Sequence, residues 1–138
     1  MLAGVKFYEW LMTHPQATPE VSRLLFSLLT DRDVVEPISN AIHYQDFIER
    51  IKVANAEFAI PVSSDFQNVK QAWQTVVDMT DALAARGEYP FNLTLNARFT
   101  RNSECLLSPA LGNEHTCFIE ILSFAPTPGW EEFSAAVK

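Results

Sequence analysis

Hydrophobic residues recur at helical spacing in two short segments near the start of the chain. Val5–Thr13 predicts a helix that ends before His14-Pro15, because a residue that precedes proline avoids the helical region. Thr18-Pro19-Glu20 predicts the start of a second helix, with a cap residue, a proline at the first position and an acid in the first turn. This helix is expected to end near Leu29, and the polar passage Asp31–Ile42 predicts loop or extended chain.

The longest helical pattern lies in the middle of the chain. Ser64 and Gln67 fit a capping box, in which each side chain accepts a hydrogen bond from a backbone N–H at the start of a helix. Apolar residues then keep the helical period through Arg86, and Gly87 is well placed to end the helix. A further helix is expected over Trp130–Lys138, after a proline-rich turn.

Strand patterns lie on both sides of this long helix. The predicted strands are Glu57–Val62, Phe91–Arg101, in which apolar and polar residues alternate, and Thr116–Phe124. Strands around one long helix predict an α+β fold, an antiparallel sheet with helices packed on one face. The length suits one domain, so residues 1–138 are interpreted as a single domain.

The alternation predicts that one sheet face, turned away from the long helix, carries polar groups that could line a site. These are Glu57, Asn96, Arg98 and Glu120. Arg98 would donate hydrogen bonds to a hydroxyl, alkoxide or carbonyl oxygen. Three large apolar residues fall on the same face, and such a mixture is typical of a ligand pocket or domain interface: Phe118, Leu122 and Phe124. The simpler alternative is that this face is exposed to solvent and holds no site, with Arg98 and Glu120 forming only a cross-strand ion pair.

Composition narrows the expected partners. Of 138 residues, 48% are hydrophobic and 20% charged, and the net charge is −7, which argues against nucleic acid and anionic membrane surfaces. No signal-peptide pattern or apolar run of membrane-spanning length is visible, so the default expectation is a cytoplasmic location. Cys105 and Cys117 are expected as free thiols in or near the core. No metal site is predicted, because the cysteines and histidines lack ligand spacing.

Three stretches carry a resemblance to a known family, over roughly residues 37–124. They are Asn40-Ala41-Ile42-His43-Tyr44, then Glu57-Phe58-Ala59-Ile60-Pro61-Val62, and most specifically Asn96-Ala97-Arg98-Phe99 running to Leu107-Ser108-Pro109-Ala110-Leu111-Gly112 and Thr116-Cys117-Phe118-Ile119-Glu120. Together they resemble the substrate-binding (cap) domain of FAD-linked oxidases of the vanillyl-alcohol oxidase class. The resemblance is closest to the aldonolactone, alditol and type II cholesterol oxidase branch.

The resemblance implies a cap sheet that closes over the flavin of an oxidoreductase acting on a CH–OH group of a sterol, sugar lactone or polyol. In that family a Glu-x-Arg pair on one cap strand contacts the reacting oxygen. Arg98 matches the arginine and Asn96 stands in place of the glutamate, so both are candidate catalytic residues, although an amide cannot be a general base. His43 is a weaker candidate for a ligand contact. The candidate substrate-binding residues are Glu57, Glu120, Phe118 and Leu122.

No segment resembles the flavin-binding domain of such oxidases. The chain is therefore interpreted as a fragment, inactive alone, that binds a small-molecule alcohol or lactone and takes no FAD itself. FAD would be held by a flavin-binding domain in cis or on a separate chain. One alternative is a stand-alone α+β ligand-binding or dimerisation module without oxidase activity, since the exposed sheet face favours a homodimer. Another is an unrelated small enzyme that uses Glu57, Arg98 and Glu120 for acid–base chemistry.

Overall fold

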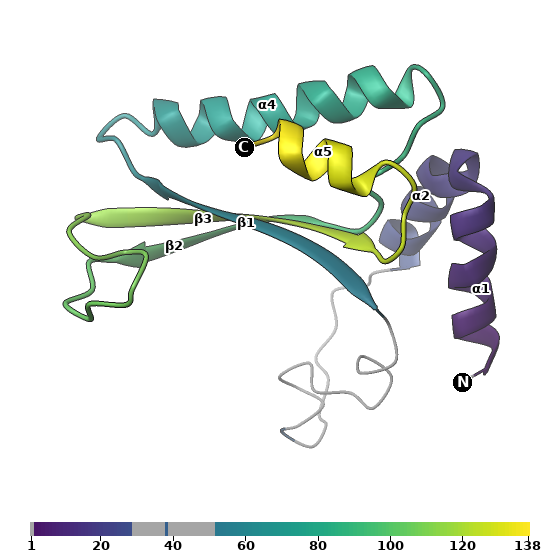
Figure 1. Cartoon of the computed structure of the whole chain (residues 1–138), viewed down its shortest axis with the longest axis horizontal. Helices are drawn as coiled ribbons and strands as arrows, with labels where there is room; N and C mark the ends of the chain where they lie inside the picture. Colours follow the sequence, from purple (N-terminus) through teal and green to yellow (C-terminus); the bar gives the residue numbers. More distant parts are fainter. Residues whose placement is uncertain (1, 29–37, 39–51) are drawn as a thin grey trace.

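The chain's structure is a computed structural model that describes residues 2–28, 38 and 52–138 (Figure 1). The predicted loop Asp31–Ile42, apart from Ile38, and the candidate His43 lie outside the described residues. In chain order the elements are α1 (Leu2–Thr13), η1 (Pro15–Ala17), α2 (Thr18–Leu28), β1 (Val53–Pro61), α4 (Gln67–Ala84), β2 (Leu95–Arg101), β3 (His115–Phe124) and α5 (Trp130–Ala136).

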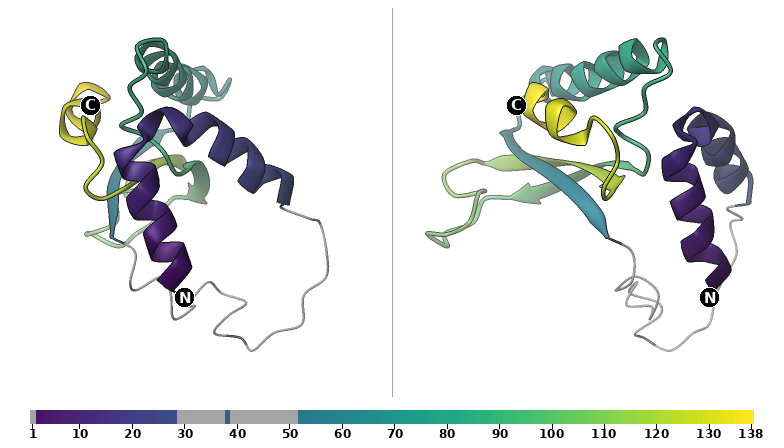
Figure 2. Two further views of the ribbon diagram at one scale, coloured as in Figure 1. Left: turned by 90° about the vertical axis from the view of Figure 1, so that its right-hand side faces the viewer. Right: turned by 45° about the vertical axis from the view of Figure 1, so that its right-hand side comes forward.

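The three strands form one antiparallel sheet in the order β1-β3-β2. Figures 1 and 2 show α4 and α5 side by side over one face of this sheet, while α1 and α2 lie beyond the end of the sheet where β3 ends. The prediction of an α+β fold with helices on one face of an antiparallel sheet is confirmed.

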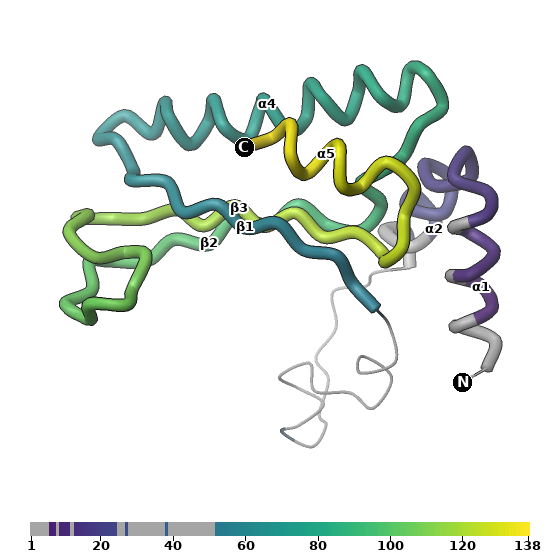
Figure 3. Tube along the Cα trace, in the orientation of Figure 1, coloured from purple at the N-terminus to yellow at the C-terminus, as the bar shows by residue number. Residues whose placement is uncertain are grey.

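The core lies between the sheet and the two helices, and β3 runs through its centre. Ile121 of β3 packs with Val76 of α4 and with Trp130 and Phe133 of α5. A second cluster joins Val69 of α4 to Cys117 and Ile119 of β3. Because side chains alternate across a strand, burying Cys117, Ile119 and Ile121 on the helix side turns the residues between them to the opposite face. Figure 3 traces the chain through the two layers, the helices α4 and α5 on one side and the three strands on the other.

β2 begins at Leu95, so the predicted start at Phe91 is wrong by four positions. Backbone hydrogen bonds to Leu122 still continue at Leu93 and Thr94, and one residue earlier the side-chain amide of Asn92 takes the place of backbone pairing. Its carbonyl oxygen accepts hydrogen bonds from the Ser123 hydroxyl (2.8 Å) and from the backbone N–H of Phe124 (3.0 Å). Because the Asn92 side chain accepts from the Phe124 N–H, the backbone can leave the sheet here without leaving that N–H unpaired.

The start of α4 also differs from the capping-box prediction. Its N-cap is Phe66, a rare non-glycine residue in the left-handed region (φ 59°), whose side chain makes no capping hydrogen bond. Asp65 instead accepts a hydrogen bond from the backbone N–H of Gln67 (3.1 Å). Gly87 follows the helix as predicted, with φ 75°, and the backbone N–H of Glu88 reaches back to the carbonyl of Leu83. The helix itself ends at Ala84, two residues before the predicted end at Arg86.

Thr18 does not cap α2 as predicted. The 3-10 turn η1 leads directly into α2, so Thr18 already has helical angles (φ −52°, ψ −48°). Its hydroxyl oxygen is buried and has no hydrogen-bond partner in the part of the chain that the structure describes. The described part of α2 runs to Leu28, and the expected end near Leu29 lies outside the described residues.

The two cysteines separate into two environments. Cys117 is fully buried in the second core cluster, as predicted, and burial raises the pKa of its thiol. Cys105 is exposed, so the expectation that it lies in or near the core is wrong. It belongs to the connection between β2 and β3, which extends past the end of the sheet in Figure 1.

Candidate functional site

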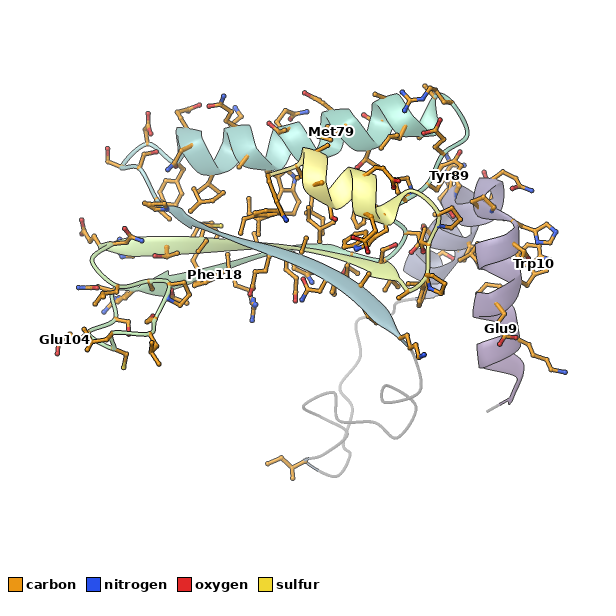
Figure 4. The ribbon with its side chains drawn as sticks, viewed as in Figure 1. Glu9, Trp10, Met79, Tyr89, Glu104 and Phe118 are labelled. Carbon is orange, nitrogen blue, oxygen red and sulfur yellow. The ribbon has the colours of Figure 1, made fainter. Side chains whose placement is uncertain are left out.

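The sheet face opposite α4 and α5 holds the candidate site, and none of the described helices covers it (Figures 1 and 2). We call it the open face. It carries all six of the predicted site residues, from three strands: Glu57 on β1, Asn96 and Arg98 on β2, and Phe118, Glu120 and Leu122 on β3. In Figure 4 the labelled Phe118 lies beneath the sheet among side chains that point away from the helices.

The strand register arranges these groups in adjoining rows. Glu57 and Asn96 both lie directly opposite Glu120, one from each side. In the next row, Arg98 lies opposite Phe118. Two carboxylates that face each other across neighbouring strands repel, so a cation nearby stabilises the arrangement.

Arg98 supplies that cation through an ion pair with Glu57. The pair spans the sheet, because the two residues sit on the outer strands β2 and β1 and the guanidinium reaches across β3. The alternative of an ion pair between Arg98 and Glu120 is therefore wrong. Arg98 keeps 60% of its side chain exposed and Glu57 keeps 36%, so solvent weakens this pair but leaves the guanidinium accessible to a ligand.

Glu120 is held by amides from both flanking strands. Nδ2 of Asn55 on β1 donates to one carboxylate oxygen (3.1 Å), and Nδ2 of Asn96 on β2 donates to the other (3.3 Å). Nδ2 of Asn96 also donates to the Thr94 hydroxyl (3.2 Å). The central carboxylate is thus fixed in orientation by neutral donors.

Asn55 is a site residue that the sequence analysis missed. β1 begins at Val53, four residues before its predicted start at Glu57, and this places Asn55 on the open face. The helix-facing residues of the missed part are Ala54 and Ala56, which are poor strand formers. The alternation over Val53–Phe58 could have predicted the longer strand, but the alternation is weak because its inward positions before Phe58 are only alanines.

Phe118 and Leu122 are half-buried on either side of Glu120, as the alternation predicted. Phe124 does not join them as exposed surface. It is only 5% exposed, because it lies where β3 runs into the turn that leads to α5. On β3, the apolar side chains of the open face are therefore Phe118 and Leu122, one on each side of Glu120.

A separate cavity of about 720 Å³ lies on the other side of the molecule, between α4, α5 and the turn after α4. Its walls are mainly apolar, including Met79, Leu83, Tyr89 and Phe133, and no open-face residue lines it. Figure 4 shows Met79 and Tyr89 on that side of the molecule. We place the site on the open face, because convergent charged and amide groups lie there.

The described residues do not suit a metal or the FAD diphosphate. Among them, no three His, Cys, Asp or Glu side chains converge as a metal site would require. A diphosphate needs several free N–H groups at one glycine-rich turn or helix start. The positive-φ glycines Gly87, Gly112 and Gly129 lie in three separate turns, and the start of α4 is occupied by the Asp65 carboxylate. None of the described helices is both long and apolar enough to cross a membrane.

The fold and the open face define an α+β domain with a mixed polar and apolar sheet surface. In comparisons with protein-family models, curated proteins and solved structures, nothing matches this chain.

Proposed function

We propose that this chain is the substrate-binding (cap) domain of an FAD-dependent oxidoreductase that oxidises a CH–OH group. The open face would cover the substrate, and FAD would be held by a flavin-binding domain in cis or on a partner chain. That flavin would accept the hydride from the carbinol carbon. Since the described part of this chain does not suit the cofactor, we assign it only substrate binding and orientation.

The observation that carries the proposal is the composition of the open face. An accessible guanidinium, a fixed carboxylate and two amides converge there from three strands. Arg98 would donate to the substrate oxygen, and Asn96 would hold the acid beside it. Phe118 and Leu122 would contact the carbon frame.

A second observation supports contact with another domain. The connection between β2 and β3 exposes Leu106 and Leu107 almost completely, at 87% and 99%. Adjacent leucines at a protruding tip are the kind of apolar surface that a partner covers. The tip belongs to the stretch that resembles the oxidase family.

The test is an NMR titration of the ¹⁵N-labelled full chain with four probes: cyclohexanol, a sugar lactone (L-gulono-1,4-lactone), a polyol (xylitol) and FAD. At least one of the first three is expected to shift backbone resonances around Asn96, Arg98 and Glu120. Arg98→Ala should weaken that binding by about tenfold, since a lost charged hydrogen bond costs about 1.5 kcal/mol or more.

Arg101→Ala is the matched control, because Arg101 lies on the same strand but faces the opposite way. It removes the same charge and should leave probe binding unchanged. Equal loss in both variants, no shift with any of the three substrate probes, or tight binding of FAD by the chain alone would each contradict the proposal.

The alternative is a stand-alone ligand-binding or dimerisation module, favoured by the half-buried Phe118 and Leu122, which none of the described helices covers. The coding sequence around this segment separates the two. A flavin-binding domain encoded in the same frame, or by an adjacent gene, supports the oxidase domain. Concentration-dependent dimers that Leu122→Asp abolishes, with no binding of any probe, would favour the module.

A further inference from the structure

The cavity of about 720 Å³ between α4, α5 and the turn after α4 takes no part in the proposed function. It lies on the helix side of the sheet, where Figure 4 shows Met79 and Tyr89, whereas Phe118 and the rest of the open face lie on the other side. Small-molecule sites in proteins are clefts of about 300–1,000 Å³ with mainly apolar walls and a few polar groups. The cavity has both properties, so it is a candidate for a second binding site.

The walls of the cavity are held by contacts within the chain. Phe133 is buried in the core, and its ring stacks on that of Phe91. The turn after α4 is anchored to the sheet, because the carbonyl of Pro90 accepts a hydrogen bond from the Ser123 hydroxyl (2.8 Å). Pro90 also lies close to Gly129 at the start of α5, where an added Cβ would come within 3.5 Å of the Cβ of Pro90. Walls that are already ordered lose little conformational freedom when a ligand binds.

Three charged side chains line the cavity, and two of them neutralise each other. The guanidinium of Arg86 donates to both carboxylate oxygens of Glu88, at 3.0 and 3.1 Å. Glu132 of α5 has no ion-pair or hydrogen-bond partner for its carboxylate among the described residues. The cavity therefore carries one uncompensated negative charge beside an apolar surface.

These charges restrict the kind of ligand that the cavity accommodates. An anionic ligand would find Arg86 already occupied by Glu88 and would be repelled by the carboxylate of Glu132. An ammonium group would instead find an acceptor in Glu132, and aromatic rings such as that of Tyr89 also attract cations. A neutral apolar ligand would gain from the walls alone and would make no use of the carboxylate.

We propose that this cavity is a second binding site and that it takes a hydrophobic amine. The apolar body of the ligand packs on Met79, Leu83 and Phe133, and its ammonium group pairs with Glu132. Burial of the apolar body provides most of the binding free energy, and the ion pair selects the charge of the ligand. The site does not rest on the proposed function, since none of its lining residues belongs to the open face.

The test compares three probes with one ring system and different charges, by NMR titration of the ¹⁵N-labelled full chain: 2-(1-naphthyl)ethylamine, the neutral 1-naphthylacetamide and the anionic 1-naphthylacetate. The amine should bind most tightly and the anion most weakly, with shifts in the backbone resonances of residues 79–90 and 128–136. Glu132→Gln should weaken binding of the amine by about fivefold, the effect of an ion pair that solvent reaches, and should leave binding of the amide unchanged. Glu131→Gln is the matched control, because Glu131 precedes Glu132 on α5 and does not line the cavity.

A second pair of variants tests the cavity itself. Ala136→Phe fills the cavity and should abolish binding of the amine and of the amide. Ala135→Phe adds the same ring at an exposed position of α5 outside the cavity and should leave both unchanged. Ala82→Phe fills the cavity from α4 and repeats the test if Ala136→Phe does not fold, which circular dichroism shows.

Tighter binding of the acetate than of the amine, equal loss in Glu131→Gln and Glu132→Gln, or no binding of the amine would each overturn this inference. Amine binding that survives in folded Ala136→Phe or Ala82→Phe would also overturn it, as would shifts confined to residues 118–122, because the ligand would then lie elsewhere. The proposed function is judged separately by its own probes and by Arg98→Ala, which should leave binding of the amine unchanged.

Discussion

Asn92 joins three segments through one side-chain amide, so its removal is expected to lower the free energy of unfolding substantially. Its carbonyl oxygen accepts from the Ser123 hydroxyl and the Phe124 N–H, and its Nδ2 donates to the Thr127 hydroxyl (3.0 Å). All three partners are buried. In Asn92→Ala, Ser123 can still donate to the carbonyl of Pro90 and Thr127 to that of Phe124, but the Phe124 N–H loses its amide acceptor.

The magnitude follows from these contacts. A buried donor that loses its acceptor costs about 1–3 kcal/mol, and the other two hydrogen bonds contribute about 1 kcal/mol each. Asn92→Ala should therefore lower the free energy of unfolding by about 3–5 kcal/mol. For a chain of this length, a loss of about 3 kcal/mol lowers Tm by about 10 °C. Urea and thermal unfolding, followed by circular dichroism, measure both quantities.

Two further variants make this result specific. Asn92→Asp keeps an acceptor oxygen and loses the donor to Thr127, so it should recover part of the loss. Asn102→Ala truncates an exposed asparagine in the connection after β2 and should change the free energy by no more than about 0.5 kcal/mol. A loss below about 1 kcal/mol in Asn92→Ala would refute the idea that this amide replaces backbone pairing.

Three other outcomes can be measured on the same chain. Thr18→Val should raise the free energy of unfolding by about 1 kcal/mol, because it removes a buried hydroxyl that has no partner among the described residues; a lower Tm would contradict this. A thiol reagent should modify Cys105 at least about tenfold faster than Cys117, which is buried and has a raised pKa; equal rates in the native chain would argue against this core. Hydrogen bonds from the Ser63 hydroxyl and from a backbone N–H lower the pKa of the Asp65 carboxyl, so its stabilisation is present above its ordinary pKa and is lost as pH falls below about 4. Ser63→Ala should raise the pKa of Asp65, and an unchanged carboxyl titration by NMR would show that this bond has no effect.

The alternation of side chains was enough to predict which residues share the open face. A strand that buries one face fixes the parity of every position, so Asn96, Arg98 and Glu120 could be grouped without knowing how the strands pair. Their contacts could not be predicted, because the order β1-β3-β2 and its register depend on distant parts of the chain. The sequence offered Glu120 as a partner for Arg98, whereas the register lets Arg98 reach Glu57 across the central strand.

The predicted starts of β2 and α4 were wrong because of local features: a side chain that replaces a backbone hydrogen bond and a residue with an unusual backbone conformation. The alternating pattern begins at Phe91, yet the Asn92 side chain satisfies the Phe124 N–H of β3 in place of the backbone, and β2 begins only at Leu95. At the start of α4, Phe66 adopts a left-handed conformation that residue statistics assign to glycine or asparagine. Neither feature has a signature in hydrophobic periodicity.

The central strand of the sheet is the last of the three in the chain, and this determines when the sheet can form. Among the described strands, β1 and β2 pair with β3 and not with each other, so neither of these two pairs can form until residues 115–124 have left the ribosome. Until then α4 exposes the apolar side chains that later cover β3. Non-local pairing of this kind slows folding and prolongs the exposure of apolar surface. Nascent chains stalled before β3 has emerged from the ribosome should therefore be bound by chaperones, and their release should coincide with the emergence of β3 from the ribosome rather than with its synthesis.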